Sequence, residues 1–512
     1  MALANLEDII RKFGVERANA PMMTFDGTVT RTYGETQERS NRVANGLLAL
    51  GVKAGSRVAI VAKNGPAFFE TLFGIRKIGA VQVAVNWRLA ADEVKFIIED
   101  AGAEVVFFDP ELAMIATSIP VASVRKYIAL GPDFEAWVAA QSTADTDYRS
   151  GPDDVALQLY TSGTTGRPKG AMLMNRSVFG FYDAAHRAFG NDPESIHLNC
   201  LPLFHVGGIN WSLQAFAHGA HVIAFRDFDP DVVIQEIERS KVTHLMTVPA
   251  VIQLLLSRPV VRTTSMKSLR LINYGGSSIS EKVLKDAIAT FGHVLHGMYG
   301  GTELSFGATL LTPDEHVDPA HPEWLRSVGR PWPGTEIKIV NPHSHEELKE
   351  GETGEVWFKS VQRGLGYWKR PEATADTFRE DGWYRSGDLG HQIGGYVFLS
   401  DRLNDMVVSG GENIYPAEIE RVLGEHDDVA EVVAFGVPDP KWGEAVVAVV
   451  VRTKDGKVDA DTLMTFASER LAKFKRPREI RFAETLPRTP SGKVQRHVLR
   501  GPYWEGYQRR IN

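Results

Sequence analysis

Residues 160–170, YTSGTTGRPKG, place hydroxyl side chains, three glycines and one lysine within eleven positions. Small hydroxyl residues and glycines let a backbone approach an anion closely, and Lys169 adds a positive charge. The segment therefore predicts a phosphate-binding loop. It is not a Walker loop, because Arg167 and Pro168 separate Gly166 from Lys169 and no Ser or Thr follows the lysine.

Six further stretches contain glycines, hydroxyl residues and charged residues in patterns suited to binding a nucleotide. In chain order they are LPLFHVGG (201–208), NYGGSSIS (273–280), MYGGTE (298–303), GWYRSGDLG (382–390), DRLNDMVVSGGENIYPAEIE (401–420) and PRTPSGK (487–493). Together with the loop at 160–170, they resemble the ordered signatures of the adenylate-forming superfamily. That superfamily includes acyl-CoA synthetases, nonribosomal peptide adenylation domains and beetle luciferase. The pattern is most similar to bacterial medium- to long-chain fatty-acyl-CoA synthetases.

The resemblance implies a ligase reaction in two steps. A carboxylate attacks the α-phosphate of ATP, releasing pyrophosphate and leaving an acyl-adenylate. The acyl group then passes to the thiol of coenzyme A, and AMP is released. No enzyme nucleophile is needed, because the substrate oxygen attacks directly. The protein must align two anions that repel each other and stabilise charge on phosphorus, which calls for cations and hydrogen-bond donors.

Matched residue by residue, the resemblance implies a nucleotide site. The ATP phosphates would meet Thr161, Ser162, Gly163, Thr164, Thr165, Gly166, Lys169, Gly300 and Thr302. The adenine would lie beside Gly275, Gly276, Ser277 and Tyr299, and the ribose beside Asp388 and Arg402. The chain has Ser386 where the family more often has Thr, and Ser277 and Ser278 where it often has Ala-Pro.

Four residues are implied in catalysis: Lys493, Glu303, Thr161 and His205. Lys493 would reach the carboxylate and the α-phosphate together and neutralise their repulsion. Glu303 would hold Mg²⁺, a hard cation that takes oxygen ligands and keeps several waters. Taken alone, Lys493 could be a solvated lysine and Glu303 a surface acid.

A mobile C-terminal domain is implied for the second step. Residues 401–405 would form a hinge between an AMP-binding domain (1–400) and a mobile domain (406–512), and Asn404 stands where most relatives have Asp or Lys. Coenzyme A would contact Ser409, Gly410, Gly411, Trp442, Phe474 and Arg476, for which ordinary surface roles are the alternative. The last part of the chain is also locally basic, since ten lysines and arginines between 470 and 500 face few acids. This indicates either a polyanionic small molecule or a solvated face.

The identity of the acid is addressed by His205. Amino-acid-activating relatives commonly have Asp at this position, so the histidine argues against an amino-acid substrate. In acyl and aryl ligases the residue resembles a wall beside the carboxylate, with a core-packed histidine as the alternative. The mostly apolar stretches GGINWSLQAFAHG and GGTELSFGATLL favour an apolar acyl chain. An aromatic-acid CoA ligase and a non-catalytic adenylate-binding protein remain alternatives.

The elements that must position these residues are predicted from alternating runs of apolar strands and helical patterns over the first 300 residues. Examples are SRVAIVAKN before PAFFETLFGIRKIG, and VTHLMTVP before AVIQLLLSR. Continuous apolar strands are typical of α/β sheets covered on both faces, so we expect two layered α/β subdomains. From about residue 330, short strands between Gly and Pro turns predict a small β-rich subdomain, and a small α+β domain follows.

Composition limits the remaining possibilities. With 512 residues, 43% of them hydrophobic, the chain is globular and long enough for several cores. The net charge of −7 gives no general attraction to nucleic acid. One cysteine, Cys200, and an N-terminus without the apolar core of a signal peptide favour a cytoplasmic protein without membrane spans. We expect a monomer or homodimer, and peripheral membrane contact stays open.

Overall fold

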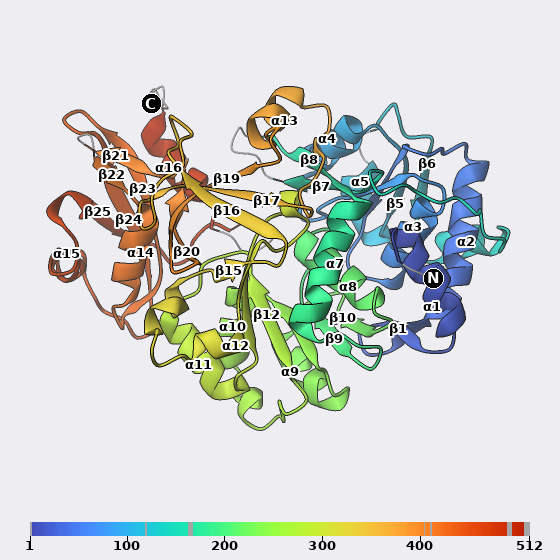
Figure 1. Ribbon diagram of the computed structural model, residues 1–512, viewed down its shortest axis with the longest axis horizontal. Coiled ribbons are helices and arrows are strands. Elements are labelled where there is room, and N and C mark those ends of the chain that lie inside the picture. Colours follow the sequence, from blue (N-terminus) through green and yellow to red (C-terminus); the bar gives the residue numbers. More distant parts are fainter. Residues whose placement is uncertain are drawn as a thin grey trace. The chain divides into compact units, whose positions relative to one another are not determined.

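The computed structural model describes residues 3–117, 120–161, 167–403, 405–409, 412–488 and 494–505 (Figure 1). The chain forms two compact units. Unit 1 comprises Met1–Ser278, Val283–Glu336 and Phe358–Arg385, and unit 2 comprises Ile279–Lys282, Ile337–Trp357 and Ser386–Asn512. Unit 2 thus includes segments that precede the expected boundary at 401, because their strands pair within its own sheet. The hinge and the mobility of residues 406–512 stay predictions.

A nine-stranded sheet forms one half of unit 1. Its spatial order is β15 (Arg330–Pro331), β14 (Thr309–Leu311), β13 (Leu295–Tyr299), β12 (Leu271–Gly275), β11 (His244–Thr247), β9 (Ile196–Asn199), β10 (His221–Ala224), β1 (Pro21–Phe25) and β2 (Val29–Thr32). The strands from β13 to β1 are parallel, and β14, β15 and β2 extend the sheet at its edges. The associated helices are α7 (Asn175–Phe189), α8 (Val206–Phe216), α9 (Pro230–Arg239), α10 (Pro249–Leu256), α11 (Glu281–Phe291) and α12 (Pro313–His316).

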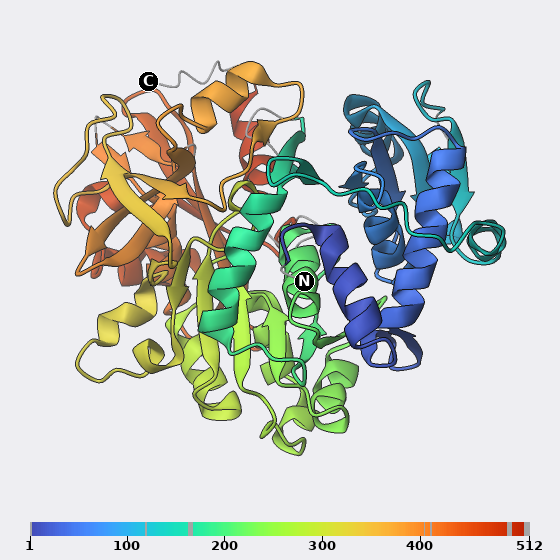
Figure 2. The same ribbon diagram turned by 45° about the vertical axis from the view of Figure 1, so that its right-hand side comes forward.

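A seven-stranded sheet forms the other half of unit 1 (Figure 2). Its order is β18 (Gly366–Tyr367), β8 (Lys169–Met174), β7 (Val155–Thr161), β4 (Val81–Ala84), β3 (Arg57–Val61), β5 (Ala103–Phe108) and β6 (Lys126–Ala129). Its helices are α1 (Leu6–Glu16), α2 (Tyr33–Ala49), α3 (Pro66–Arg76), α4 (Ala91–Ala101), α5 (Ala113–Thr117), α6 (Pro132–Ala139) and α13 (Pro371–Thr377).

Strand β3 shows why the apolar runs predicted this layered fold. Val58 and Ile60 pack in the same core cluster as residues of α2 and α3, whereas Ala59 and Val61 pack with Val94 of α4. Successive side chains of a strand point to opposite faces, so a run without polar residues is buried on both sides only where helices cover both. The prediction of layered α/β sheets is confirmed.

Unit 2 is built on two further sheets. The first contains β16 (Thr335–Val340), β17 (Gly354–Ser360), β19 (Tyr384–Ile393) and β20 (Tyr396–Arg402), of which residues 335–336, 358–360 and 384–385 belong to unit 1. The second contains β22 (Glu412–Ile414), β21 (Val407–Ser409), β24 (Gly443–Arg452), β23 (Val429–Asp439) and β25 (Glu479–Phe482), with helices α14 (Pro416–Gly424), α15 (Ala460–Ser468) and α16 (Arg496–Trp504). These elements match the short strands and the α+β region expected after residue 330.

The basic region near the C-terminus differs from the expectation that its cations face few acids. Seven of them form ion pairs: Arg470 with Glu469, Lys475 with Glu418, Arg478 with Asp439, Arg481 with Glu479, Arg488 with Glu431, Arg496 with Glu420 and Arg500 with Asp405. The expectation was wrong because most of these acids come from earlier segments, which the strands and helices of unit 2 bring next to the tail.

The helices and the single cysteine bear on the environment of the chain. Within the described residues, no helix is both long enough and apolar enough to span a bilayer. Cys200 is partly exposed as a residue, yet burial around its sulfur raises the pKa of the thiol well above its ordinary value. The thiol is therefore held in its neutral form.

Candidate active site

Two side chains of unit 1 contact the carboxylate of Glu303, and a third lies beside one of them. Thr161 ends β7 and is paired with Lys169, the first residue of β8. Glu303 lies in the short helix η3 (Thr302–Leu304), and its Oε1 accepts a hydrogen bond from the Tyr367 hydroxyl at 2.8 Å and one from Thr161 Oγ1 at 3.5 Å. The ammonium of Lys169 lies 5.2 Å from the centre of the Tyr367 ring. We call Thr161, Lys169, Glu303 and Tyr367 the Glu303 cluster.

The cluster joins the two sheets of unit 1. Glu303 follows β13 of the nine-stranded sheet, whereas Thr161, Lys169 and Tyr367 belong to the seven-stranded sheet. A backbone bond from Gly364 N to Glu303 O, 2.8 Å long, fixes the connection. The carboxylate is therefore positioned in part by long-range packing.

The turn that carries Glu303 has little freedom. A Cβ on Gly300 would lie 2.1 Å from the carbonyl oxygen of Phe306, so only glycine fits there. Ser305, which ends η3, has a φ of 59°, unusual for a residue with a side chain. It is fully buried, its hydroxyl donates to Gln362 O at 2.9 Å, and its own carbonyl accepts from the Asn210 amide. These bonds hold a strained turn, and with it Glu303, in one conformation.

Burial and the neighbouring carboxylate of Glu303 raise the pKa of Tyr367 far above its ordinary value. The phenol therefore stays protonated and acts only as a donor toward Glu303. Among the described residues, none donates to the other carboxylate oxygen, Oε2. One anionic oxygen is thus held in place while the second is left for a ligand.

The donor set suits Mg²⁺ when phosphates share the coordination. No group of three or more acidic, His or Cys side chains converges in the described part of the chain, so this is no all-protein cage. Mg²⁺ is usually bound by one or two carboxylates together with waters and substrate phosphates. Glu303, beside the Thr161 hydroxyl, fits that requirement.

The residues expected near the adenine end two adjacent strands. Gly275 closes β12 and Tyr299 closes β13, and these parallel strands are paired from Ile272 with Leu295 to Gly275 with Met298. In open α/β sheets ligands bind at the carboxyl ends of strands, where these residues stand. A Cβ on Gly275 would lie 2.2 Å from Met298 O, and Gly276 has a φ of +82°, so both positions require glycine. Ser277 follows them in the same loop.

His205 precedes α8 as its N-cap residue. Its ring lies 4.4 Å from the ring of Phe204, which in turn meets Trp87 edge-on at 6.4 Å. The imidazole is therefore in contact with an aromatic wall and is only partly buried. That environment is compatible with the predicted position beside an acyl group.

The predicted ribose-binding pair lies in unit 2. Asp388 on β19 is paired in register with Arg402 on β20, and Arg402 Nε is 3.7 Å from Asp388 Oδ1. Ser386 accepts a bond from Asp388 N at 3.0 Å and donates to Val356 O at 2.6 Å. The hydroxyl at 386 thus orients the backbone of Asp388, a role that Thr would also fill.

The described residues expected at coenzyme A are also in unit 2. Ser409 ends β21 and pairs with Gly443. Trp442 and Phe474 are 40% and 45% exposed, although large apolar side chains are usually buried. Arg476 donates to the carbonyls of Leu471 and Ser468 at 3.2 and 2.8 Å, near the end of α15. The two aromatic rings are thus open to solvent, whereas Arg476 already serves the backbone.

Several predicted residues lie outside the described part of the chain. They are Ser162, Gly163, Thr164, Thr165, Gly166, Asn404, Gly410, Gly411 and Lys493.

The sequence did not indicate Tyr367, Ser305 or Asn210 as parts of the site. Tyr367 lies in GYWKRP, which belongs to none of the stretches singled out, and it is 64 residues from Glu303. The one local signal near Tyr367 is the run GLGY, in which glycines on both sides of Leu365 indicate close backbone packing.

Comparison with known proteins agrees with this geometry. The family model described as AMP-binding enzyme matches residues 11–368, and the model described as AMP-binding enzyme C-terminal domain matches residues 418–493. The chain is 39% identical to the fatty acid–[acyl-carrier-protein] ligase ScoC of Streptomyces coeruleorubidus, covering 94% of this chain and 93% of that one. It is 37% identical to a feruloyl-CoA synthase of Amycolatopsis sp, covering 93% and 94%.

A solved structure has the same architecture. ATP-bound MatB from Rhodopseudomonas palustris superimposes with a TM-score of 0.89 at 31% identity, covering 98% of this chain and all of that chain. The family models together with relatives that match almost the whole chain show that the chain belongs to the AMP-binding enzyme family.

Proposed function

We propose that the protein is an AMP-forming acid–thiol ligase that converts a carboxylic acid, ATP and coenzyme A into acyl-CoA, AMP and pyrophosphate. The observation that carries the proposal is the Glu303 cluster: a rigidly held carboxylate beside a threonine hydroxyl and a lysine, at the two ends of a glycine-rich loop. Such a group of an anion, a donor and a cation suits a polyphosphate with its metal ion. The family membership of the whole chain supports the same reaction.

In the first step, the residues of the chain act on charge. Lys169 and the loop that precedes it neutralise the outer phosphates, and Thr161 donates a hydrogen bond to them. Lys493 would reach both the attacking carboxylate and the α-phosphate and reduce their repulsion. When bound at Glu303, Mg²⁺ supplies Lewis-acid stabilisation of the phosphate oxygens. Asp388 and Arg402 hold the ribose, and the Gly275 loop and Tyr299 hold the adenine.

In the second step, residues 401–405 act as a hinge that removes Lys493 and brings the segment at Ser409 to the acyl-adenylate. Gly410 and Gly411 would let a slender pantetheine chain pass, because glycine leaves the most room. The exposed rings of Trp442 and Phe474 would stack on the nucleotide of coenzyme A. We propose that the protein acts in the cytoplasm.

We propose that the acid is a medium- or long-chain fatty acid. The apolar helix α8 and the aromatic wall at His205 support an apolar acyl chain. An aromatic acid is the second candidate, favoured by the 37% identity to a feruloyl-CoA synthase. The acceptor has an alternative as well, since ScoC is named for ligation to an acyl carrier protein.

Pyrophosphate exchange into ATP, measured across a panel of fatty and aromatic acids, tests the first step without involving an acceptor. Exchange that depends on a fatty acid is the expected result. Exchange with aromatic acids alone would overturn the choice of substrate, and no exchange with any acid would favour a non-catalytic binding protein. Thioester formation with coenzyme A or with a phosphopantetheinylated carrier protein then identifies the acceptor.

Lys493→Ala and Gly410→Val separate the two steps. The lysine variant should lose exchange while keeping thioester formation from supplied acyl-adenylate. The glycine variant should keep exchange and lose thioester formation. Equal losses in both half-reactions for either variant would contradict the proposed division of roles.

A further inference from the structure

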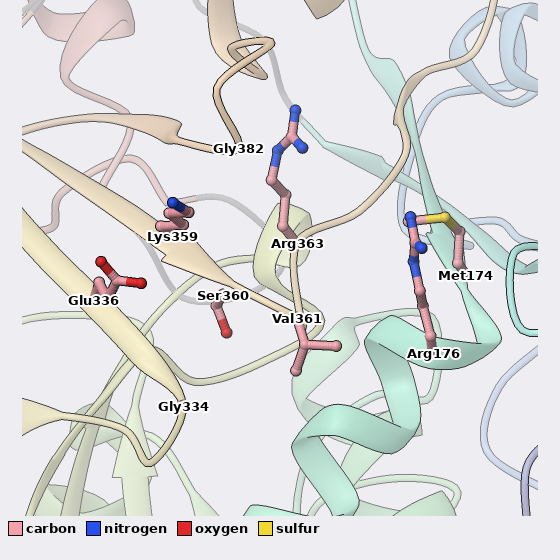
Figure 3. A pocket seen from close by; sticks show the side chains of 9 residues that line it. All are labelled: Met174, Arg176, Gly334, Glu336, Lys359, Ser360, Val361, Arg363 and Gly382. Carbon is pink, nitrogen blue, oxygen red and sulfur yellow. The ribbon is translucent and has the colours of Figure 1, made fainter.

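A pocket on unit 1 is lined by residues that the proposed reaction does not use. It has a volume of about 400 Å³, within the range of small-ligand sites. Its lining comprises Met174, Arg176, Gly334, Glu336, Lys359, Ser360, Val361, Arg363 and Gly382 (Figure 3). The pocket thus combines the first turn of α7, the ends of β16 and β17, and the loop that leads to β18.

The charge of this pocket is unbalanced. Three cations, Arg176, Lys359 and Arg363, line it with one acid, Glu336, which leaves a formal charge of 3 − 1 = +2. In Figure 3 the three cations follow one another across the pocket, with Glu336 at the Lys359 end. Within the described residues, neither Lys359 nor Arg363 forms an ion pair. Arg176 does pair with Asp153, at 2.8 Å, but through one of its nitrogens only.

Arg363 is incompletely bonded, although its guanidinium also lies 5.4 Å from the centre of the Phe378 ring. It donates one bond, to Arg379 O at 3.0 Å, and its Nε is buried without a partner. Burial lowers the pKa of its guanidinium, Asp381 opposes this shift, and the charge of Arg176 adds to it. A buried donor without a partner and two mutually repelling guanidinium groups both destabilise the empty pocket. An anion between them would remove both penalties.

From this geometry we propose that the pocket binds a phosphate group carrying two negative charges, separately from the nucleotide site. Guanidinium groups match the oxygens of phosphate in pairs, and the ammonium of Lys359 adds a point charge. A pocket charge of +2 suits a phosphate monoester better than a single carboxylate.

Two sources could supply this phosphate. One is a soluble phosphate compound; the other is the headgroup of an anionic lipid. Val361 and Leu365 are 53% and 47% exposed in the same loop as Arg363, so apolar side chains stand near the cations. Both sources share the chemistry of the proposal, and they are separated by the test.

The test uses the full chain and two probes. Inorganic phosphate is titrated by calorimetry. Co-sedimentation uses phosphatidylcholine vesicles with about 20% phosphatidic acid, which gives a strongly anionic surface. We expect at least one probe to bind, and Arg363→Gln to weaken that binding about tenfold, the loss typical of one charge-assisted bond. Lys359→Gln, which removes no buried group, should weaken it as well.

Matched controls separate this pocket from the catalytic machinery and from general charge. Arg187→Gln lies on the same helix α7 but outside the pocket, and Lys267→Gln removes an exposed lysine elsewhere in unit 1. Both should bind the probes like the unchanged protein. Titration with ATP should give the same affinity for all four variants, which shows that the nucleotide site is intact.

The outcomes divide plainly. If the pocket variants lose phosphate binding but not vesicle binding, the ligand is a soluble phosphate compound. If they lose vesicle binding, the ligand is a lipid headgroup. The proposal is overturned if neither probe binds, or if Arg363→Gln and Lys359→Gln bind as well as the two controls. A parallel fall in ATP affinity would also overturn it, because the pocket would then be part of the nucleotide site.

Discussion

The Glu303 cluster of unit 1 and the Arg496 cluster of unit 2 use carboxylates in opposite ways. In unit 1, Glu303 accepts hydrogen bonds from two hydroxyl groups, and within the described residues it forms no ion pair. In unit 2, Arg496 of α16 binds Glu420 through Nη2 at 2.7 Å and Asp405 through Nη1 at 3.1 Å, and Asp401 lies 3.5 Å away. The first arrangement leaves negative charge available, and the second neutralises it internally.

The pKa shifts of the Arg496 cluster follow from its burial. Burial acts to lower the pKa of Arg496, but Glu420, Asp401 and Asp405 outweigh it and raise the pKa above the ordinary value. For Asp401, by contrast, burial outweighs the attraction of Arg496 and raises the pKa to about 6. Glu420 therefore carries the strong ion pair, while Asp401 mainly accepts backbone bonds from Arg402 and from Ala417 in the first turn of α14.

The comparison teaches how to distinguish a binding acid from a structural acid. A carboxylate that accepts hydrogen bonds only from neutral donors keeps its negative charge uncompensated. It can therefore bind a cation supplied from outside the chain. A carboxylate fixed by a buried arginine is already satisfied, and removing the arginine leaves an uncompensated charge. Four predictions test this distinction, beginning with the largest effect.

Glu303→Gln should reduce pyrophosphate exchange about a thousandfold, roughly 4 kcal/mol in activation free energy, because it removes the charge that holds the cation at the phosphates. Stability should change little, since glutamine can still accept from Tyr367. Glu238→Gln, at an exposed position of α9, is the control and should behave normally. Normal exchange by the Glu303 variant would show that this carboxylate is structural.

Arg496→Met should destabilise unit 2 by about 3 kcal/mol, because Asp401 is then buried and Glu420 half-buried without their cation. Denaturant unfolding followed by hydrogen exchange in β23 and β24 measures the loss. The control, Arg421→Met, breaks an exposed pair with Glu425 on α14 and should cost less than about 1 kcal/mol. Equal effects of the two substitutions would remove the contrast between the clusters.

Tyr367→Phe should lower exchange about tenfold while ATP in excess restores part of the rate. The substitution removes the 2.8 Å bond that orients Glu303 but leaves the carboxylate charge. The diagnostic readout is the magnesium concentration needed for half-maximal exchange, which should rise. An unchanged magnesium requirement would mean that the tyrosine merely fills space.

Asp401 predicts a pH dependence of stability in unit 2. Because its folded pKa is about 6 and its ordinary value is 3.8, the stabilisation by the neutral acid is complete below pH 3.8 and is lost as pH rises through 6. The unfolding free energy of the unchanged protein should therefore fall with rising pH by about 1 kcal/mol more than that of Asp401→Asn. The difference is smaller than the pKa shift alone would give, because other groups in the cluster titrate as well. Parallel pH profiles of the two proteins would contradict the assignment.

Local elements of this fold were predictable, and long-range contacts were not. The strand at residues 57–61 and the helix that follows it show their burial directly in their apolar runs. The partner of Glu303 is different: Tyr367 comes from another sheet, and no local pattern indicates that β18 pairs with β8. Ser305 likewise adopts its left-handed backbone because Gln362 and Asn210 hold it, not because serine prefers it.

The charge of the C-terminal region shows the same limit. Counting residues 470–500 alone gave an excess of cations, since acids such as Glu418, Glu431 and Asp439 stand earlier in the chain. The exposed aromatic side chains Trp442 and Phe474, which the sequence had marked, do remain open to solvent. Composition over a window of the sequence is therefore a poor measure of charge neutralisation, and the contact of the two rings with coenzyme A stays a prediction.

The chemistry of Cys200 has a practical consequence. The chain has this one thiol, and it is held protonated, so it is a poor nucleophile toward both activated esters and maleimide reagents. The natural protein is thus already a low-background host for labelling: a cysteine introduced on the surface of each unit would carry a fluorophore or spin probe without first removing the native one. Distances between such probes, read during turnover, would test whether the two units move relative to each other.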